Sequence, residues 1–310
     1  MQRDVAYATH DRALEYLRTR HAATGRTMAE ESAKQPEDVR VAIAVEELGK
    51  GETRVVLRVQ TDNDATWRAI DEMRAEGVVP EDAEVEYIGR MRGLGPQDAV
   101  SPVQPGVSCA PNIGPAGTIG CFARRNGERF LVSANHVIAQ ENHAEVGIDG
   151  VVQPLAGASG VRTIGVLHDF VALQPVGGNA MDAAIARLTI DDIDPRLFNG
   201  RRIASVRPTE LLKGDRVFKF GQMSEEREGI VLSTISNIAL DMSFGTYTFD
   251  LHIEVGTPPE LPFSVSGDSG ALVYDEADRA VGILIGGNQS TRSYVTPIER
   301  VLGQFELTLM

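Results

Sequence analysis

The stretch with the clearest chemical potential is Gly267-Asp268-Ser269-Gly270, which presents one hydroxyl between two glycines. A serine hydroxyl is a weak nucleophile at neutral pH, so a hydrolase that uses one needs a base within hydrogen-bond reach and donors for the oxyanion. Gly267 would let its own N–H and that of Ser269 point into one hole, and Gly270 would leave room for a substrate. These residue types are also common turn formers, so the tetrapeptide alone is equally consistent with a plain turn.

A candidate base and a candidate acid lie upstream of this stretch. His136 follows an apolar run over residues 130–134, where a strand would give way to a short helical turn, and Asp182 begins the apolar run 183–186. Subtilisin-like enzymes order these residue types as Asp, His, Ser, and α/β-hydrolases as Ser, acid, His. The order His, Asp, Ser found here fits only the chymotrypsin-like arrangement.

Other residues of the same types compete for these roles. His143 and His168 lie among polar turn residues or inside a predicted strand, without a small residue and an apolar strand leading into them, so His136 is preferred as the base. Asp169 also precedes an apolar run, but it lies nearer an edge loop than Asp182 does. We therefore take Asp182 as the acid.

Together these segments resemble the trypsin-like (chymotrypsin-fold) serine peptidases, specifically the bacterial branch without a secretion signal that includes the plant narrow-leaf type proteases. The resemblance covers roughly residues 104–310. Four motifs carry it, namely Asn135-His136-Val137, Met181-Asp182-Ala183-Ala184-Ile185-Ala186, Gly267-Asp268-Ser269-Gly270 and the closing run 280–287. It implies two packed six-stranded β-barrels, with these residues in the cleft between them.

The resemblance also implies roles. His136 would be the general base and then acid, Asp182 would orient its imidazole, Ser269 would be the nucleophile, and the N–H groups of Gly267 and Ser269 would form the oxyanion hole. The expected activity is a serine endopeptidase forming an acyl-enzyme on a specific intracellular protein, without metal or organic cofactor. The alternative is a catalytically quiet binding or scaffold protein on the same fold. Such members normally lose a triad residue or an oxyanion glycine, and this chain keeps them all.

The family pattern further suggests a substrate pocket. Its floor would lie about six residues before the nucleophile, at Phe263, with walls from Ile285 to Gly287 and near Ser293. Because no aspartate occupies the floor, a requirement for Arg or Lys is not supported. We expect small or medium apolar side chains instead.

Asp268 is the residue that, in secreted members of this family, pairs with a new N-terminus made by zymogen cleavage. Here about 105 residues precede the first barrel, and no Arg or Lys activation site stands beside an Ile-Val pair. We predict that Asp268 is satisfied by an internal partner and that activity needs no such cleavage. An active form beginning near Val107 would contradict this prediction.

The chain divides into two predicted domains. Residues 1–95 read as an α+β regulatory or assembly domain with helices on one face of a small sheet, residues 96–116 as linker and entry to the barrel, and residues 117–310 as the mostly β double barrel. In the first domain the patterns predict a helix within 9–33, strands over 39–45, 53–59 and 84–88, and a helix capped by Asp64.

Composition narrows the partners. A net charge of −14 argues against nucleic acid and anionic membranes. The first residues lack the apolar core of a signal peptide, and no run approaches the roughly 20 apolar residues of a membrane span, so we expect a cytoplasmic protein. The expected partners are a protein or peptide substrate and, through residues 1–95, a second copy or another protein.

The cysteine count fits the same compartment. Cys109 and Cys121 are too few for a secreted disulfide framework, and two buried thiols are favoured over a bridge. A metal site made from these cysteines with His136 and His143 would lack a close ligand pair, so none is expected.

Overall fold

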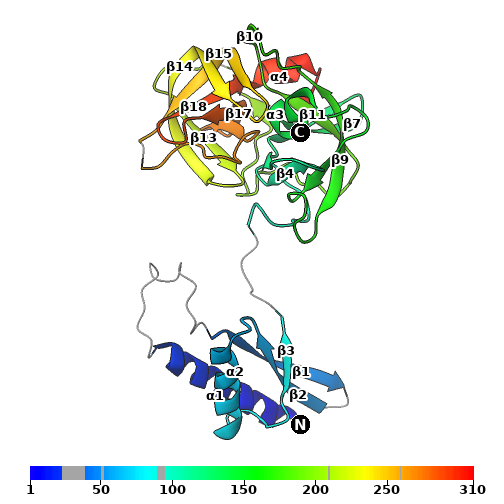
Figure 1. The fold of residues 1–310 in the computed structure, drawn as a ribbon, viewed down its shortest axis with the longest axis vertical. Coiled ribbons are helices and arrows are strands. Elements are labelled where there is room, and N and C mark those ends of the chain that lie inside the picture. Colours follow the sequence, from blue (N-terminus) through cyan, green and yellow to red (C-terminus); the bar gives the residue numbers. More distant parts are fainter. Residues whose placement is uncertain (23–38, 50–51, 89–94, 209, 259) are drawn as a thin grey trace. The chain divides into compact units, whose positions relative to one another are not determined.

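The computed structural model describes residues 1–22, 39–49, 52–88, 95–208, 210–258 and 260–310 (Figure 1). The chain divides into two compact units, Met1–Gly93 and Leu94–Met310, close to the boundary that the sequence predicts.

The first unit is a three-stranded sheet with two helices. Its elements are α1 (Arg3–Ala22), β1 (Val41–Gly49), β2 (Glu52–Val59), α2 (Asp64–Ala75) and β3 (Glu84–Tyr87). The central strand β2 pairs antiparallel with β1 and parallel with β3, and α2 makes the crossover between the two parallel strands. Leu17 of α1, Leu57 of β2 and Met73 of α2 share one buried cluster, so both helices cover the same face of the sheet.

Two details of this unit differ from the sequence prediction. The first helix begins at Arg3, earlier than predicted, because Ala6 also faces the core and extends the buried stripe toward the N-terminus; residues 23–33 of the predicted helix lie outside the described residues. The second helix is capped by Asn63, whose side-chain oxygen accepts a 2.8 Å hydrogen bond from the N–H of Thr66. Asp64 is instead the first helical residue, where its negative charge faces the positive end of the helix dipole.

The second unit contains two β-barrels. The strands of the first are β4 (Ser108–Pro111), β5 (Gly117–Thr118), β6 (Cys121–Arg125), β7 (Glu128–Ser133), β8 (Gly150–Gln153), β9 (Arg162–Phe170) and β11 (Ala184–Leu188). The bent segment β5–β6 pairs with β4 at one end and with β7 at the other, and the ring continues through β11, β9 and β8 back to β4. Part of the segment 96–116, predicted as linker and entry to the barrel, lies in the barrel itself. It contributes β4, and Val103 and Val107 are buried in the barrel core.

The second barrel closes in the same way. Its strands are β13 (Arg216–Gly221), β14 (Glu225–Asp241), β15 (Thr246–Gly256), β16 (Leu272–Asp275), β17 (Arg279–Gly287) and β18 (Arg292–Pro297). They pair antiparallel in the order β13-β14-β15-β18-β17-β16 and back to β13. The short strands β10 (Gly178–Asn179), β12 (Ser205–Val206) and β19 (Thr308–Leu309) pair with β15, β17 and β6, and α4 (Ile298–Gln304) follows β18. The predicted mostly β double barrel is confirmed.

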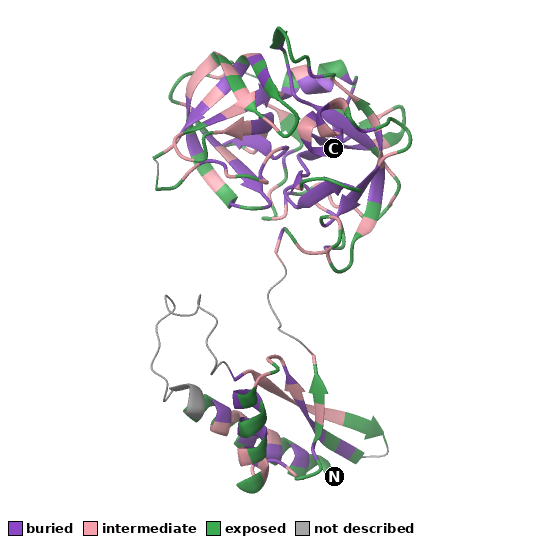
Figure 2. Cartoon of the chain, in the orientation of Figure 1, coloured by how far each residue is buried: buried purple, intermediate pink, exposed green. Residues whose placement is uncertain are grey.

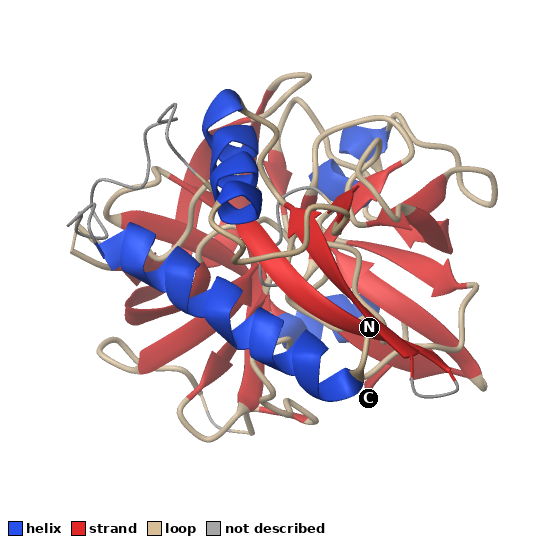
Figure 3. Cartoon of the chain, turned by 90° about the horizontal axis from the view of Figure 1, so that it is seen from below, coloured by secondary structure: helices blue, strands red, loops and turns tan. Residues whose placement is uncertain are grey.

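Alternation along β7 explains how the barrels meet. Leu131 points into the core of the first barrel, whereas Phe130 and Val132 belong to a separate cluster shared with Tyr274 of β16 and Phe305 after α4. Burial of each large side chain contributes about 1.5–3 kcal/mol, so this shared cluster is a strong reason for the two barrels to pack together. Figure 2 shows these buried strands in purple, and Figure 3 shows that strands (red) dominate the chain and helices (blue) are few. The end of β7 is thereby placed between the two barrels.

Candidate active site

His136 lies at the place where β7 has just ended. The short helix α3 (Asn135–Ile138) begins two residues after Ser133, and the imidazole is half-buried, with 18% of its side chain exposed. Because β7 packs toward the second barrel, the turn after it opens into the groove between the barrels. The predicted strand followed by a helical turn is present at this position.

Asp182 holds the ring of His136 from the loop between β10 and β11. Its carboxylate is fully buried and accepts two hydrogen bonds from one residue: the His136 Nδ1 atom lies 2.5 Å from Oδ2, and the His136 backbone N lies 3.1 Å from Oδ1. Two bonds to one carboxylate fix both the position and the rotation of the imidazole. The second ring nitrogen, Nε2, is left for the pocket.

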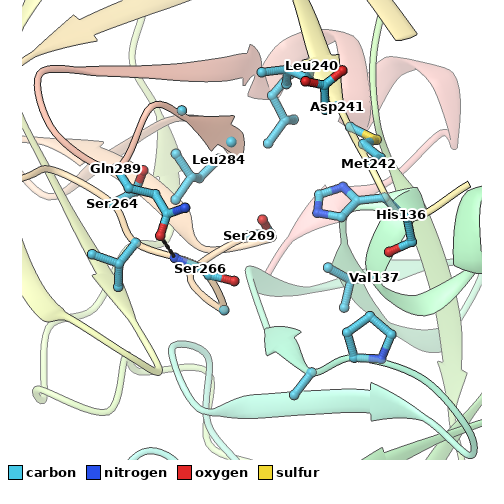
Figure 4. Close-up of a pocket in the computed structure, with 18 of the residues that line it drawn as sticks. His136, Val137, Leu240, Asp241, Met242, Ser264, Ser266, Ser269, Leu284 and Gln289 are labelled. Carbon is cyan, nitrogen blue, oxygen red and sulfur yellow. Dashed lines mark hydrogen bonds between the residues drawn. The ribbon is translucent and has the colours of Figure 1, made fainter. Parts of the chain in front are cut away.

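Ser269 stands on the tight turn before β16. Gly267 and Gly270 flank it with φ angles of 96° and 90°, in the left-handed region that favours glycine. A Cβ atom at Gly267 would lie 2.5 Å from Met223, so the turn also needs the missing side chain for space. The serine hydroxyl and the His136 ring line the same pocket of about 460 Å³, whose walls come from both barrels (Figure 4). Within the described residues no hydrogen bond joins the two groups.

Two backbone N–H groups beside Ser269 are available to an anion. In the part of the chain that the structure describes, the N–H groups of Gly267 and Ser269 donate to no protein acceptor, whereas those of Asp268 and Gly270 donate to carbonyl oxygens at 3.1 and 2.8 Å. The carbonyl of Gly267 accepts a 2.9 Å hydrogen bond from Thr118 Oγ1, which helps to fix the orientation of the turn. This arrangement can stabilise negative charge on an oxygen next to Ser269.

Asp268 has an internal partner, as predicted. Its carboxylate pairs with Lys219 of β13 at 2.8 Å, and both side chains are fully buried. Ser224 Oγ and the N–H groups of Val265, Met223 and Ser224 also donate to it. Burial by itself raises the pKa of Asp268, but the charge of Lys219 and these hydrogen bonds outweigh it and hold the pKa below its usual value. The ion pair therefore fixes the turn that carries Ser269 without a new N-terminus.

We predict that Lys219→Met destabilises the double-barrel unit by about 3–5 kcal/mol, because it leaves the buried charge of Asp268 without its counterion. Chemical denaturation should show this loss, and the double variant Lys219→Met/Asp268→Asn should recover part of it. The matched control is Lys213→Met at an exposed position. A loss below about 1 kcal/mol in Lys219→Met would contradict the structural role of the pair.

The environment of His136 favours its protonated form. Burial by itself lowers the pKa of the imidazole. The charge and hydrogen bond of Asp182 and the charge of Glu141 raise this pKa by more than burial lowers it, so it lies above its ordinary value. A base placed in this way gains stability when it takes a proton from a neighbouring hydroxyl. The site can therefore perform proton transfer from Ser269.

The alternative residues lie elsewhere. Asp169 is exposed and caps the N–H of its own neighbour Phe170 at 2.8 Å. His168 Nε2 lies 2.9 Å from a guanidinium nitrogen of Arg125, and His143 stacks on Phe244 with ring centroids 4.1 Å apart. Among the candidate bases and acids named from the sequence, His136 and Asp182 are the described pair that contact one another.

The predicted substrate pocket is partly wrong. Ile285 and Gly287 line the pocket, but Phe263 is 1% exposed and packs in the core of the second barrel, where it fills the space beside Gly229. Ser264 lines the pocket in its place, and Ser293 lies behind it, with 2.7 Å between their Oγ atoms. A count of residues back from the nucleophile does not show which neighbour faces the core. The pocket wall is therefore more polar here than the sequence indicated.

Sequence reasoning missed the tip of the β14–β15 hairpin and Glu141. Leu240, Asp241, Met242 and Ser243 line the pocket, and so does Glu141 from the opposite barrel (Figure 4 shows the first three). Leu240 and Asp241 end β14, Met242 and Ser243 follow in the turn, and Glu141 lies in a short 3-10 segment; no motif in the sequence marks any of them. The only available signal was that Glu141 follows His136 closely in the chain.

Both cysteines are free and buried, in agreement with the favoured prediction. Burial raises the pKa of Cys109 and of Cys121 to about 12, which suppresses the reactive thiolate. Across the described ranges, no group of three or more His, Cys, Asp or Glu side chains is placed to hold a metal ion. Nor does any helix in those ranges have the length and apolar character needed to cross a membrane.

His252 of β15 gives the second unit a predicted acid sensitivity. It is fully buried, with Nε2 3.0 Å from Thr296 Oγ1 and Nδ1 2.9 Å from the Asp250 carbonyl oxygen, and burial lowers its pKa to about 4. In the unfolded chain this imidazole takes up a proton near pH 6.5, as an ordinary histidine does. Between about pH 6.5 and pH 4 the site is therefore protonated in the unfolded chain and neutral in the folded one. Stability should fall by about 3 kcal/mol as the pH is lowered through this window.

Urea unfolding of the wild type and His252→Gln from pH 7 to pH 4 tests this expectation. The wild type should lose more stability than the variant, because only the wild type must exclude a proton from this site. Parallel pH profiles would contradict it.

No protein-family model matches the chain, and no curated protein matches it. Solved structures do resemble it. A glutamic acid specific serine protease is 19% identical, with 67% of this chain and 100% of that chain covered and a TM-score of 0.49. Thermobifida fusca Protease A is 20% identical, covering 67% of this chain and 99% of that one, with a TM-score of 0.47. A Nocardiopsis protease is 20% identical over the same shares, with a TM-score of 0.48.

These likenesses are too weak to carry an argument, and the two closed strand rings define the fold by themselves. The second unit is a trypsin-like double β-barrel. Asp182 contacts His136, and His136 and Ser269 line one pocket between its barrels.

Proposed function

We propose that this chain is a serine endopeptidase that hydrolyses peptide bonds through His136, Asp182 and Ser269. The observation that carries the proposal is the double hydrogen bond of Asp182 to His136 at the pocket that Ser269 lines. A merely structural histidine would not need a fully buried carboxylate that fixes both its backbone and its ring. The two unused N–H groups next to the serine supply the remaining part of the machinery.

The proposed reaction has two halves. Ser269 Oγ attacks the scissile carbonyl carbon while its proton moves to His136 Nε2, and the carbonyl oxygen becomes an anion held by the N–H groups of Gly267 and Ser269. The C–N bond then breaks as His136 returns the proton to the leaving amine, which produces an acyl-enzyme. In the second half, His136 takes a proton from a water molecule, which attacks the ester carbonyl carbon. The ester C–O bond then breaks as His136 returns this proton to Ser269 Oγ, which releases the acid product and regenerates the free serine. No metal or organic cofactor takes part in these steps.

A proteome-derived peptide library tests the proposal. We expect new peptide termini, read by mass spectrometry, that appear with the wild type and not with Ser269→Ala. A fluorophosphonate probe should label the wild type at Ser269. Absence of both cleavage and labelling would favour the quiet scaffold or binding protein over the enzyme.

We also propose that the substrate is a specific intracellular protein and that the enzyme works in the cytoplasm. The two free buried thiols are compatible with a reducing compartment. Fractionation of the native cells with an antibody tests the location, and recovery of the protein outside the cytoplasm would contradict it. The net charge of −14 makes nucleic acid and anionic membranes poor partners.

The first unit is proposed to restrain or assemble the enzyme. It has its own core and its own sheet. Its His10 also contacts an aspartate, with Nδ1 3.1 Å from Asp11 Oδ1, but the two residues are chain neighbours and the carboxylate is exposed, whereas Asp182 is fully buried. Comparing residues 97–310 with the whole chain tests this role. Equal peptidase rates together with equal oligomeric states would remove it.

A further inference from the structure

Glu141 joins the two barrels beside the candidate active site. It lies in the short 3-10 turn η2 (Gln140–Asn142) of the first barrel and is 3% exposed. One carboxylate oxygen accepts the N–H of Ser243 at 2.7 Å, and the other accepts the N–H of Phe244 at 2.9 Å. Both donors lie at the tip of the β14–β15 hairpin of the second barrel. A single buried carboxylate therefore holds a hairpin across the groove.

The turn that carries Glu141 has an unusual backbone. Gln140, Glu141 and Asn142 have φ angles of 50°, 53° and 75°, so three successive residues that are not glycine occupy the left-handed region. Each such residue costs of order 1–3 kcal/mol and persists only where its surroundings hold it in place. This cost indicates that the position of the Glu141 side chain matters more than local backbone preference.

The surroundings that hold this turn also hold His136. Asn135, the neighbour of His136, donates from Nδ2 to Asn142 Oδ1 at 2.9 Å and accepts from the Asn142 N–H at 3.3 Å. Asn142 Nδ2 in turn donates to the carbonyl of Leu173 at 2.8 Å. The turn and the catalytic histidine therefore form one fixed unit, and Glu141 connects this unit to the hairpin.

The hairpin tip is a wall of the pocket. Leu240, Asp241, Met242 and Ser243 line it together with His136, opposite the loop that carries Ser269 (Figure 4). Phe244, whose side chain is 60% exposed, makes a second connection by stacking on His143. An extended peptide lying in the groove would contact this wall away from the scissile bond, whereas a small acyl substrate would not reach it.

We propose that Glu141 is a positioning residue for peptide substrates, which holds the hairpin tip in place as one wall of the peptide-binding groove. The substrate role rests on the proposed peptidase function, whereas the clamp itself does not. The negative charge of Glu141 has a second effect: together with the charge of Asp182, it raises the pKa of His136. Tyr247, His143 and Asp241 are further titratable groups near Glu141 and its hairpin contacts.

The test compares Glu141→Gln with the matched control Glu145→Gln, an exposed glutamate four residues further along the chain. The amide side chain keeps the size of the carboxylate but turns one acceptor into a donor that faces an N–H group. Hydrogen exchange at the Ser243 and Phe244 amides should become at least about tenfold faster in Glu141→Gln, which corresponds to the loss of one hydrogen bond to a charged group. Glu145→Gln should match the wild type.

Two kinetic readouts separate positioning from a general loss of structure. For Glu141→Gln, KM for a long peptide should rise about tenfold, whereas kcat/KM for a short activated ester should change less than about threefold. The acid limb of the pH profile should move to lower pH, because removal of the negative charge lowers the pKa of His136. Phe244→Ala, a change at an exposed residue, should also raise KM for the long peptide. This variant replaces Glu141→Gln in the test if Glu141→Gln folds poorly.

Each outcome has a distinct meaning. Unchanged exchange at Ser243 and Phe244 would overturn the clamp. Faster exchange with equal losses on long and short substrates would overturn the positioning role and leave Glu141 as a purely structural contact. If the wild type neither hydrolyses substrates nor reacts with a serine probe, the proposed function fails and the substrate role fails with it, while the exchange data still decide whether Glu141 holds the hairpin.

Discussion

Ser269→Ala should lower kcat for peptide hydrolysis by about 10⁶-fold, the scale seen when a triad serine is removed from another serine protease. The variant keeps Gly267 and its N–H group, so the residual rate should still exceed that of the uncatalysed reaction by about 10³–10⁴-fold. The reason is that covalent catalysis is lost while part of the electrostatic stabilisation remains. Initial rates on a long peptide substrate measure this change.

The folded structure should survive this substitution. Ser269 is half-buried, and its hydroxyl makes no hydrogen bond within the described part of the chain. KM and the denaturation midpoint should therefore change little. Ser205→Ala, at an exposed position on β12, is the control for loss of a serine hydroxyl outside the groove. A Ser269→Ala protein that retains more than about one per cent of the wild-type rate would show that another group performs the attack.

Asp182→Asn should lower kcat by about 10⁴-fold with little change in KM. The amide oxygen can still accept the His136 backbone N–H, which the carboxylate now accepts at 3.1 Å, so the loop should keep its position. The amide nitrogen, however, cannot accept a hydrogen bond from the ring Nδ1–H group, whose nitrogen now lies 2.5 Å from the carboxylate. The imidazole would then adopt the wrong tautomer and lose the charge that stabilises its protonated form.

The control for this prediction is Asp169→Asn, a change in the rival acid, whose exposed carboxylate accepts a hydrogen bond from the N–H of Phe170. Its kinetics should match those of the wild type within about threefold. Steady-state rates on one peptide, measured for both variants at the same pH, decide the assignment. A large loss in Asp169→Asn combined with a small loss in Asp182→Asn would reverse the roles of the two acids.

The sequence by itself determined the parts that local patterns encode. The apolar run that begins at Phe130, with His136 shortly after it, indicates the end of a strand. The structure then shows that this strand is buried on both faces. Gly267 and Gly270 mark a turn that other residues cannot make. The order of His136, Asp182 and Ser269 then restricted the fold to the double barrel.

Only the tertiary structure decided which distant groups meet. The sequence predicts that Asp268 needs an internal partner, but it does not identify Lys219, because the contact depends on the register of two paired strands. It equally gives no sign that Phe263 turns into the core while Ser264 faces the pocket, or that Glu141 reaches the amides of Ser243 and Phe244. Periodicity and motifs report on residues close together in the chain. Contacts between groups 49 to 103 positions apart are selected by packing and by pairing of buried charges, which exist only once the barrels have closed.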